Sequence, residues 1–211
     1  MIIDGTSRPR RLRQSSIIRD LCAETRLTSQ GLIQPYFVCD GKNVREQIVG
    51  MEGIYRESVD RLIESTSQDK KLGIKNVMLF GVTDKKDAAA SQAVDSNNSV
   101  MRACTELKQR FGDELFVSAD VCLCGYTDHG HCGIVVNNKI DNDRSVEILT
   151  QMALALARAG SDCVAPSDMM DGRIGAIRAA LEREGFSNTL ILSYTAKYSS
   201  AYYGPFREAA L

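Results

Sequence analysis

Three of the seven cysteines and both histidines of the chain lie in one short segment, residues 120–133. Cys122 and Cys124 are two residues apart, so their side chains share one side of an extended backbone. Cys132 follows after seven intervening residues. Thiolates are preferred zinc ligands, and three of them leave one of the four tetrahedral positions open. The spacing therefore predicts a zinc site of Cys122, Cys124 and Cys132 that could accept a substrate.

Two other interpretations of this segment remain open. His129 or His131 could supply a fourth ligand, which would give a closed structural zinc site. Alternatively, the three cysteines could simply be buried apolar residues. The other four cysteines lie in apolar or helical surroundings and are expected to be ordinary core residues: Cys22, Cys39, Cys104 and Cys163.

Residues 165–173 and 193–207 form two further groups of polar side chains. In the first group, Ser167 and Asp168 are residue types that cap helix N-termini, so capping alone could explain them. In the second, Lys197 lies among tyrosines. Burial disfavours the ammonium form of lysine, and a neutral amine can attack a carbonyl carbon. A single lysine near aromatic rings is more often a surface residue with a buried stem.

Alternating apolar runs and helical periodicities predict the elements that position these groups. Short apolar runs typical of buried parallel strands occupy 32–39, 76–82, 115–123, 162–166 and 189–195. Helices are expected at 44–63, 100–110, 144–159 and 174–184, the third capped by Asn142 or Asp143 and ended by Gly160. Strands and helices that alternate in this way predict an α/β fold with a parallel sheet or barrel. All three polar groups then follow strands, where such folds place active sites.

Composition excludes several classes of protein. The chain has 211 residues and a formal charge of −1, so it offers no electrostatic basis for binding nucleic acid or an acidic membrane. No stretch approaches the ~20 apolar residues of a membrane span, and no signal-peptide core is evident. An odd number of cysteines without an export signal argues against a disulfide framework, so we expect a cytoplasmic protein.

A basic cluster near the N-terminus comprises Arg8, Arg10, Arg11 and Arg13. It could be a nucleic-acid patch. An extended arm that pairs with carboxylates is favoured, because the remaining sequence has no matching basic field. We therefore expect residues 1–30 to form an N-terminal arm and residues 31–211 one partial (β/α) barrel domain.

Taken together, these segments resemble the porphobilinogen synthase family, also called 5-aminolevulinate dehydratase, in its zinc-dependent branch. The resemblance runs from the arm to the last residue and rests on 8–13, 120–133, 165–173 and 197–207. It implies a TIM (β/α)8 barrel with an arm that wraps a neighbouring subunit, commonly in a homo-octamer. It also implies a lyase that condenses two molecules of 5-aminolevulinate into porphobilinogen, with loss of water, for haem and other tetrapyrroles.

The resemblance assigns roles to individual residues. Lys197 matches one of the family's two Schiff-base lysines, and Asp120 matches an acidic residue that assists proton transfer. Ser167, Phe206 and Arg207 match residues of the substrate pockets. The three cysteines Cys122, Cys124 and Cys132 match the zinc ligands of that branch.

The chain departs from the family pattern after Arg207. Five strands are expected where a closed barrel has eight and about 250 residues, and no lysine follows Lys197. The sequence is therefore interpreted as truncated at its C-terminus, and the 211 residues alone are expected to bind zinc poorly and to be inactive. Two alternatives remain: a class I aldolase-like Schiff-base enzyme, which gives the cysteines no role, and a non-catalytic form that assembles with full-length subunits and regulates them.

Overall fold

The computed structural model describes residues 8–195, 197 and 198. The strands are β1 Gln34–Val38, β2 Arg45–Gln47, β3 Tyr55–Glu57, β4 Asn76–Gly81, β5 Phe116–Val121, β6 Ile134–Val136, β7 Lys139–Asp141, β8 Cys163–Pro166 and β9 Leu190–Ile191. The α-helices are α1 Ser16–Leu21, α2 Val59–Lys71, α3 Ser99–Phe111, α4 Asn142–Arg158 and α5 Arg173–Arg183. Short 3₁₀ helices occur at Pro9–Arg13, Ser29–Gly31, Ser91–Val94 and Gly112–Glu114.

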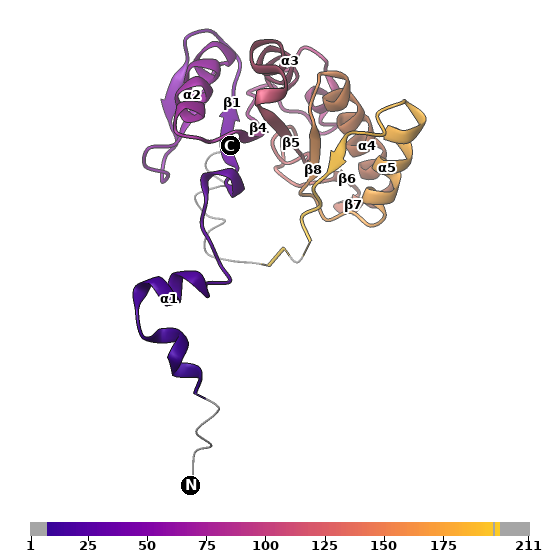
Figure 1. The fold of residues 1–211 in the computed structure, drawn as a ribbon. Helices are drawn as coiled ribbons and strands as arrows, with labels where there is room; N and C mark the ends of the chain where they lie inside the picture. The colour runs from indigo at the N-terminus through magenta and orange to yellow at the C-terminus, as the bar shows by residue number, and fades with distance from the viewer. Residues whose placement is uncertain (1–7, 196, 199–211) are drawn as a thin grey trace.

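Seven strands form one sheet in the order β2-β3-β1-β4-β5-β8-β9. From β1 to β9 each strand pairs in parallel with its neighbour, and their spatial order is their order in the chain. A helix follows each of the first four of these strands (Figure 1). This succession is that of a (β/α) barrel, as the sequence predicted. Within the described residues the sheet is not closed, and β2 and β9 lie at its two edges.

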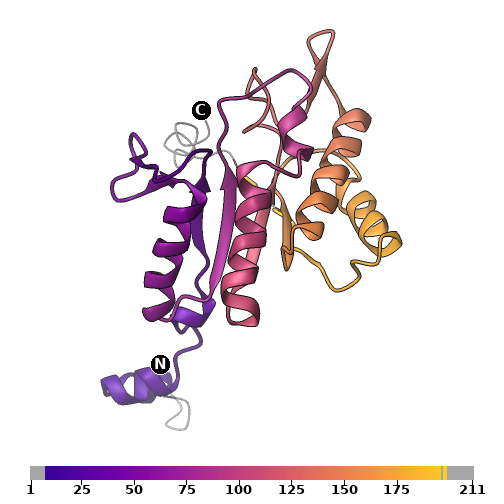
Figure 2. The same ribbon diagram turned by 90° about the horizontal axis from the view of Figure 1, so that it is seen from above.

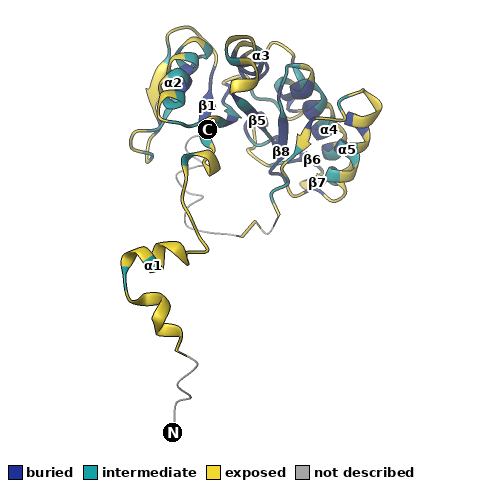
Figure 3. Ribbon diagram, in the orientation of Figure 1, coloured by how far each residue is buried: buried dark blue, intermediate teal, exposed yellow. Residues whose placement is uncertain are grey.

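The two faces of the sheet pack differently. Side chains alternate between the faces of a strand, and those of Val77 and Leu79 on β4 belong to the larger apolar core. That core also contains buried residues of α2, α3, α4 and α5, which cover this face. On the other face, Phe37 and Phe80 belong to a smaller cluster with Ile48. Figure 3 shows the buried residues concentrated in the strands and on the inner sides of the helices.

The prediction of a helix at 44–63 is wrong for the first part of this range. That stretch contains β2 and β3, which pair antiparallel, and α2 begins only at Val59. Gly50 and Gly53 lie between the two strands with φ of +79° and +77°. Only glycine adopts this conformation without strain, so the chain turns where a helix would have continued.

A second difference lies directly after the cysteine segment. Residues 134–141 form a small hairpin, β6 and β7, which the sequence analysis did not predict. Its turn uses Asn137 and Asn138 at positive φ, a conformation that asparagine tolerates. The cap of α4 is Asp141, whose carboxylate accepts from the Arg144 N–H at 3.1 Å, instead of Asn142 or Asp143. Gly160 follows the end of this helix at φ +96°, as expected.

The segment before β1 has no buried residue in its helices. It extends away from the sheet in two roughly perpendicular views (Figures 1 and 2). Ile17 and Leu21 of α1 are 78% and 75% exposed. Cys22 is exposed as well, so the expectation that it is a core residue is wrong, whereas Cys39, Cys104 and Cys163 are buried. None of the described helices is long and apolar enough to cross a membrane.

Candidate active site

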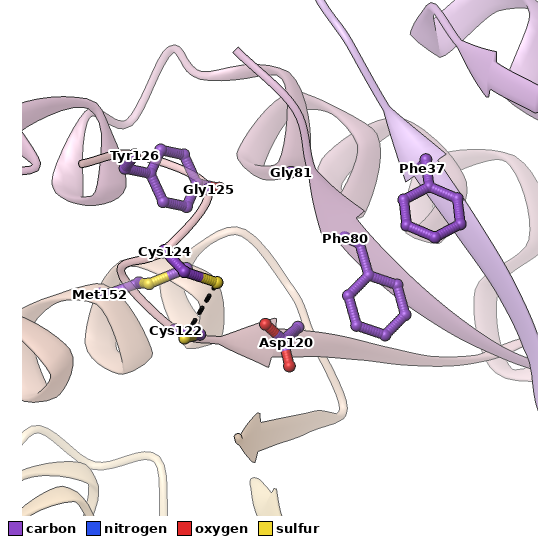
Figure 4. Close-up of a pocket in the computed structure, with 9 residues that line it drawn as sticks. All are labelled: Phe37, Phe80, Gly81, Asp120, Cys122, Cys124, Gly125, Tyr126 and Met152. Carbon is purple, nitrogen blue, oxygen red and sulfur yellow. Dashed lines mark hydrogen bonds between the residues drawn. The ribbon is translucent and has the colours of Figure 1, made fainter. Parts of the chain in front are cut away.

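The three cysteines of residues 120–133 come together at the carboxyl end of β5. Cys122 follows this strand directly, and the sulfurs of Cys122 and Cys124 are 3.3 Å apart (Figure 4). With Cys132 they form a cluster in which all ligand atoms lie within 4.8 Å of one another. Cys122 is buried, and the other two are partly exposed. One strand and its loop therefore suffice to gather three thiols around one point.

The three sulfurs share their protons unequally. Hydrogen bonds from the Cys122 and Cys124 thiols lower the pKa of Cys132 to about 3. Hydrogen bonding to Cys124 and Cys132 raises the pKa of Cys122. Because a thiol that donates a hydrogen bond stabilises the accepting thiolate, the cluster favours the thiolate form of Cys132. A negatively charged group of three sulfurs suits a soft divalent cation such as zinc.

Neither histidine belongs to this cluster within the described part of the chain. The Nδ1 atom of His129 accepts a hydrogen bond from the His131 backbone N–H at 3.1 Å, and the two rings lie 5.3 Å apart. The cluster therefore has three donors, which leaves a fourth metal position open.

A small pocket adjoins the sulfurs. It is lined by Phe37, Phe80, Gly81, Asp120, Cys122, Cys124, Gly125, Tyr126 and Met152, most of which Figure 4 shows around Asp120. The rings of Phe37 and Phe80 stack with their centroids 5.4 Å apart. The pocket thus combines an apolar wall with a carboxylate and two thiols, as small-molecule sites commonly do.

Asp120 is the carboxylate of this pocket. Its burial raises its pKa to about 7, against a hydrogen bond from Ser167 and the positive charge of Lys197, which both lower it. Its Oδ1 atom is buried without a hydrogen-bond partner. A carboxyl group with such a pKa can gain or lose a proton near neutral pH.

Lys197 contacts the loop that follows β8. Its Nζ donates to the backbone oxygen of Ser167 at 2.5 Å. The loop after β8 starts next to the end of β5, which carries Asp120 and the cysteines, and the charge of Lys197 contributes to lowering the pKa of both Asp120 and Cys132. β9 ends at Ile191, before the end of the strand predicted at 189–195, and Lys197 is exposed, which agrees with the alternative of a surface lysine and not with a desolvated one.

Neither Ser167 nor Asp168, the two candidate caps in residues 165–173, caps a helix. α5 begins at Arg173, and its cap is Gly172, which makes no side-chain hydrogen bond. Asp168 is fully buried; its Oδ1 accepts from the Met170 N–H at 2.8 Å and forms an ion pair with Arg173 Nε at 3.1 Å. Burial raises the pKa of Asp168. These residues therefore shape the loop next to Lys197.

Two of the expected substrate residues, Phe206 and Arg207, lie outside the described residues. The structure also brings to the site residues that the sequence analysis did not select. Phe37 and Phe80 looked like ordinary core residues of strands, since their alternation does not tell which face lines a pocket. Tyr194 is a further residue of the site that the sequence did not indicate. Burial raises the pKa of Tyr194 to about 12, and the nearby charges of Asp120 and Cys122 raise it to a smaller extent.

The fold and the site define a parallel α/β protein of the barrel type with a thiol cluster at its strand ends. The chain belongs to the delta-aminolevulinic acid dehydratase family, whose family model matches residues 6–211. Delta-aminolevulinic acid dehydratases of Methanothermus sociabilis and Bacillus subtilis are 49% and 46% identical to it over 203 and 204 residues. These matches cover 96% and 97% of the chain.

The fold is also that of a solved relative. The crystal structure of delta-aminolevulinic acid dehydratase (porphobilinogen synthase) from Toxoplasma gondii ME49, in complex with the reaction product porphobilinogen, superimposes with a TM-score of 0.91 at 40% identity. This superposition covers 97% of the present chain and 58% of the Toxoplasma chain. The chain likewise spans 63% of the length of both curated relatives above, and 98% of the length of one from Ruminiclostridium josui.

Proposed function

We propose that this chain carries a porphobilinogen synthase site, at which two molecules of 5-aminolevulinate condense with loss of water. One observation carries the proposal. The amine of Lys197 donates to the backbone oxygen of Ser167 in the loop after β8, and β8 pairs with β5, whose carboxyl end carries Asp120 and the cysteine cluster, so an amine, a carboxyl and three thiols lie at neighbouring strand ends. The family membership and the product complex of the Toxoplasma relative support the same chemistry.

Lys197 is the residue we propose forms the Schiff base. Its amine would attack the ketone carbon of 5-aminolevulinate, and the ketone oxygen would leave as water to give an imine. An imine withdraws electrons, which acidifies the neighbouring C–H bonds and makes the carbon electrophilic. The Ser167 backbone oxygen, 2.5 Å from Nζ, would orient the amine toward the site.

Cys122, Cys124 and Cys132 are the residues we propose hold a zinc ion. Three sulfurs within 4.8 Å, with negative charge favoured on Cys132, fit the ligand set of an open zinc site. Bound zinc supplies Lewis-acid chemistry, which polarises a carbonyl or lowers the pKa of a bound water. Because β5 and its loop supply all three sulfurs, we propose that this chain itself binds one zinc ion, in place of the weak binding expected from the sequence.

Asp120 is proposed to assist proton transfer, because its carboxyl lines the pocket beside the sulfurs with one oxygen unpartnered. Ser167 lies beside both Asp120 and Lys197 and is proposed to contact substrate. For Phe206 as a pocket wall and Arg207 as a partner of a substrate carboxylate, the proposal rests on the family resemblance.

We further propose a homo-oligomer, commonly an octamer in this family, that is assembled through an N-terminal arm of residues 1–30, with residues 31–211 as the catalytic unit. The exposed apolar residues of α1 support this role, since such side chains gain by burial against a partner. A cytoplasmic location is proposed because all seven cysteines are free thiols.

Reduction with borohydride in the presence of 5-aminolevulinate tests the proposed function. An imine on Lys197 would be reduced to a stable amine, so mass spectrometry of peptides should find one substrate-derived adduct on Lys197. Lys197→Arg keeps the positive charge but cannot form the adduct. Lys42→Ala, which removes an exposed lysine from the loop after β1, should leave the adduct unchanged.

Other results would contradict the proposal. Adducts that form only with sugar phosphates would favour an aldolase-like enzyme. No adduct with either compound would favour a non-catalytic chain that assembles with other subunits.

A further inference from the structure

A turn after β4 contacts the cysteine loop, and one side chain organises this turn. The Oδ1 atom of Asp87 accepts hydrogen bonds from the backbone N–H groups of Ala89 and Ser91, both at 3.0 Å. The backbone oxygen of Asp87 accepts from the Ala90 N–H at 3.2 Å. Asp87 thus binds three consecutive amides and fixes the course of residues 87–91.

The backbone of the same residue pairs with the loop that carries the cysteines. The Asp87 N–H donates to the Tyr126 carbonyl at 3.2 Å, and the Asp87 carbonyl accepts from the Asp128 N–H at 3.4 Å. Tyr126 and Asp128 lie between Cys124 and Cys132 in the chain. Any shift of the turn would therefore be transmitted to the stretch that brings the third sulfur to the other two.

The turn is held in a conformation that it would not adopt freely. Ala90 has φ +53° and is completely buried. A non-glycine residue in this region is strained and persists only where neighbouring contacts hold it. The two hydrogen bonds to the Asp87 carboxylate are such contacts, so their loss should loosen the turn.

We propose that Asp87 is a positioning residue for the cysteine cluster: its carboxylate orders the turn whose backbone clamps the loop between Cys124 and Cys132. The expected effect on zinc binding rests on the proposed function. The expected effect on the positions of the three thiols does not depend on a metal. Asp87 touches no sulfur, so it would act only through the backbone of Tyr126 and Asp128.

The reactivity of Cys122 in the reduced, metal-free chain tests this role. Cys122 is 3% exposed, so iodoacetamide reaches its sulfur only when the loop opens. Asp87→Ala should raise its alkylation rate roughly three- to tenfold, because the clamp loses two side-chain hydrogen bonds. In the same variant the affinity for zinc, measured against a chromophoric chelator, should fall by about tenfold, as for other groups that orient metal ligands.

Two variants separate positioning from general stability. Asp87→Asn keeps an oxygen that can accept from the same amides, so it should restore most of the wild-type alkylation rate. Asp95→Ala is the matched control. The Asp95 carboxylate also orders a turn between β4 and α3, where it accepts from the Asn97 N–H at 2.8 Å. That turn leads into α3 and not to the cysteine loop.

An unchanged alkylation rate in Asp87→Ala would overturn the proposal, as would an equal increase in Asp95→Ala or no recovery in Asp87→Asn. If the wild-type chain binds no zinc, the proposed metal site fails. The alkylation rates of Cys122 still decide the role of Asp87 in that case.

Discussion

At the scale of single residues, the site depends on close approach between backbone and side chains. Cys122, Cys124 and Asp120 line one pocket together with Tyr126, which packs against the end of β4. Its ring lies directly against Gly81, where a side chain would collide. Gly81 is therefore a residue of the site although it has no functional group of its own.

Substitution of Gly81 by alanine should destabilise the chain and loosen the cysteine loop. The added Cβ would overlap the Tyr126 hydroxyl and would lie 2.9 Å from Val100 Cγ2. Overpacking of this kind costs about 1–3 kcal/mol of unfolding free energy, which urea denaturation of the metal-free chain can measure. Tyr126→Phe, which removes the most severely overlapping atom, should recover part of the loss when combined with Gly81→Ala.

Gly175→Ala is the matched control for this prediction. Gly175 lies in α5, and no atom lies within 4 Å of the position that its Cβ would take. Alanine there should leave stability unchanged or raise it by about 0.5–1 kcal/mol, because glycine weakens helix interiors. Equal effects of the two substitutions would show that Tyr126 does not pack against β4 as described.

Residue types and spacing predicted the cysteine cluster because its members are close in the chain. Lys197 could be selected because it follows a strand and because the family resemblance includes it. The positions of Phe37, Arg173 and Asp87 depend on contacts between distant segments, which local periodicity does not encode.

At the scale of elements, the parallel sheet brings the cysteine loop, the Ser167 loop and Lys197 together at the carboxyl ends of its strands. Strands β5 and β8 are neighbours, so the cysteine loop and the Ser167 loop start side by side. Sequence periodicity identified β1, β4, β5, β8 and β9, as well as α3, α4 and α5, because each lies in an apolar or amphipathic run that is long enough to show a pattern. It missed the hairpins of β2–β3 and β6–β7, whose strands have three residues each and too few positions for a pattern.

The arm carries several apolar side chains that are mostly exposed within the described chain: Leu12, Ile17, Leu21 and Leu27. The double variant Ile17→Asp/Leu21→Asp should shift the protein to smaller assemblies in sedimentation velocity, since each buried side chain of this size contributes about 1.5–3 kcal/mol to docking. The unfolding midpoint of the sheet domain should stay unchanged, because the helices of the arm contain no buried residue.

Leu72→Asp serves as the control for the arm, because Leu72 is 76% exposed at the end of α2. It should not change the assembly. Identical sedimentation of the wild-type chain and the double variant would contradict the assembly role of the arm.

At the scale of the whole molecule, 97% of the chain follows the fold of the Toxoplasma relative. The described sheet already brings together the strand ends that carry the sulfurs, Asp120 and the Ser167 loop. No closure of the sheet is required for these groups to meet. The proposed metal site should therefore be measurable on this chain itself.

Zinc bound per chain after equilibrium dialysis, measured by mass spectrometry of the metal, tests the central claim most directly. The wild-type chain and Cys22→Ser, which changes an exposed thiol of the arm segment, should each retain one zinc ion. Cys124→Ser and Cys132→Ser should lose it while keeping the circular dichroism of the folded chain, because each removes one of three sulfurs within 4.8 Å. Full zinc occupancy in either of these two variants, or none in the wild-type chain, would contradict the account.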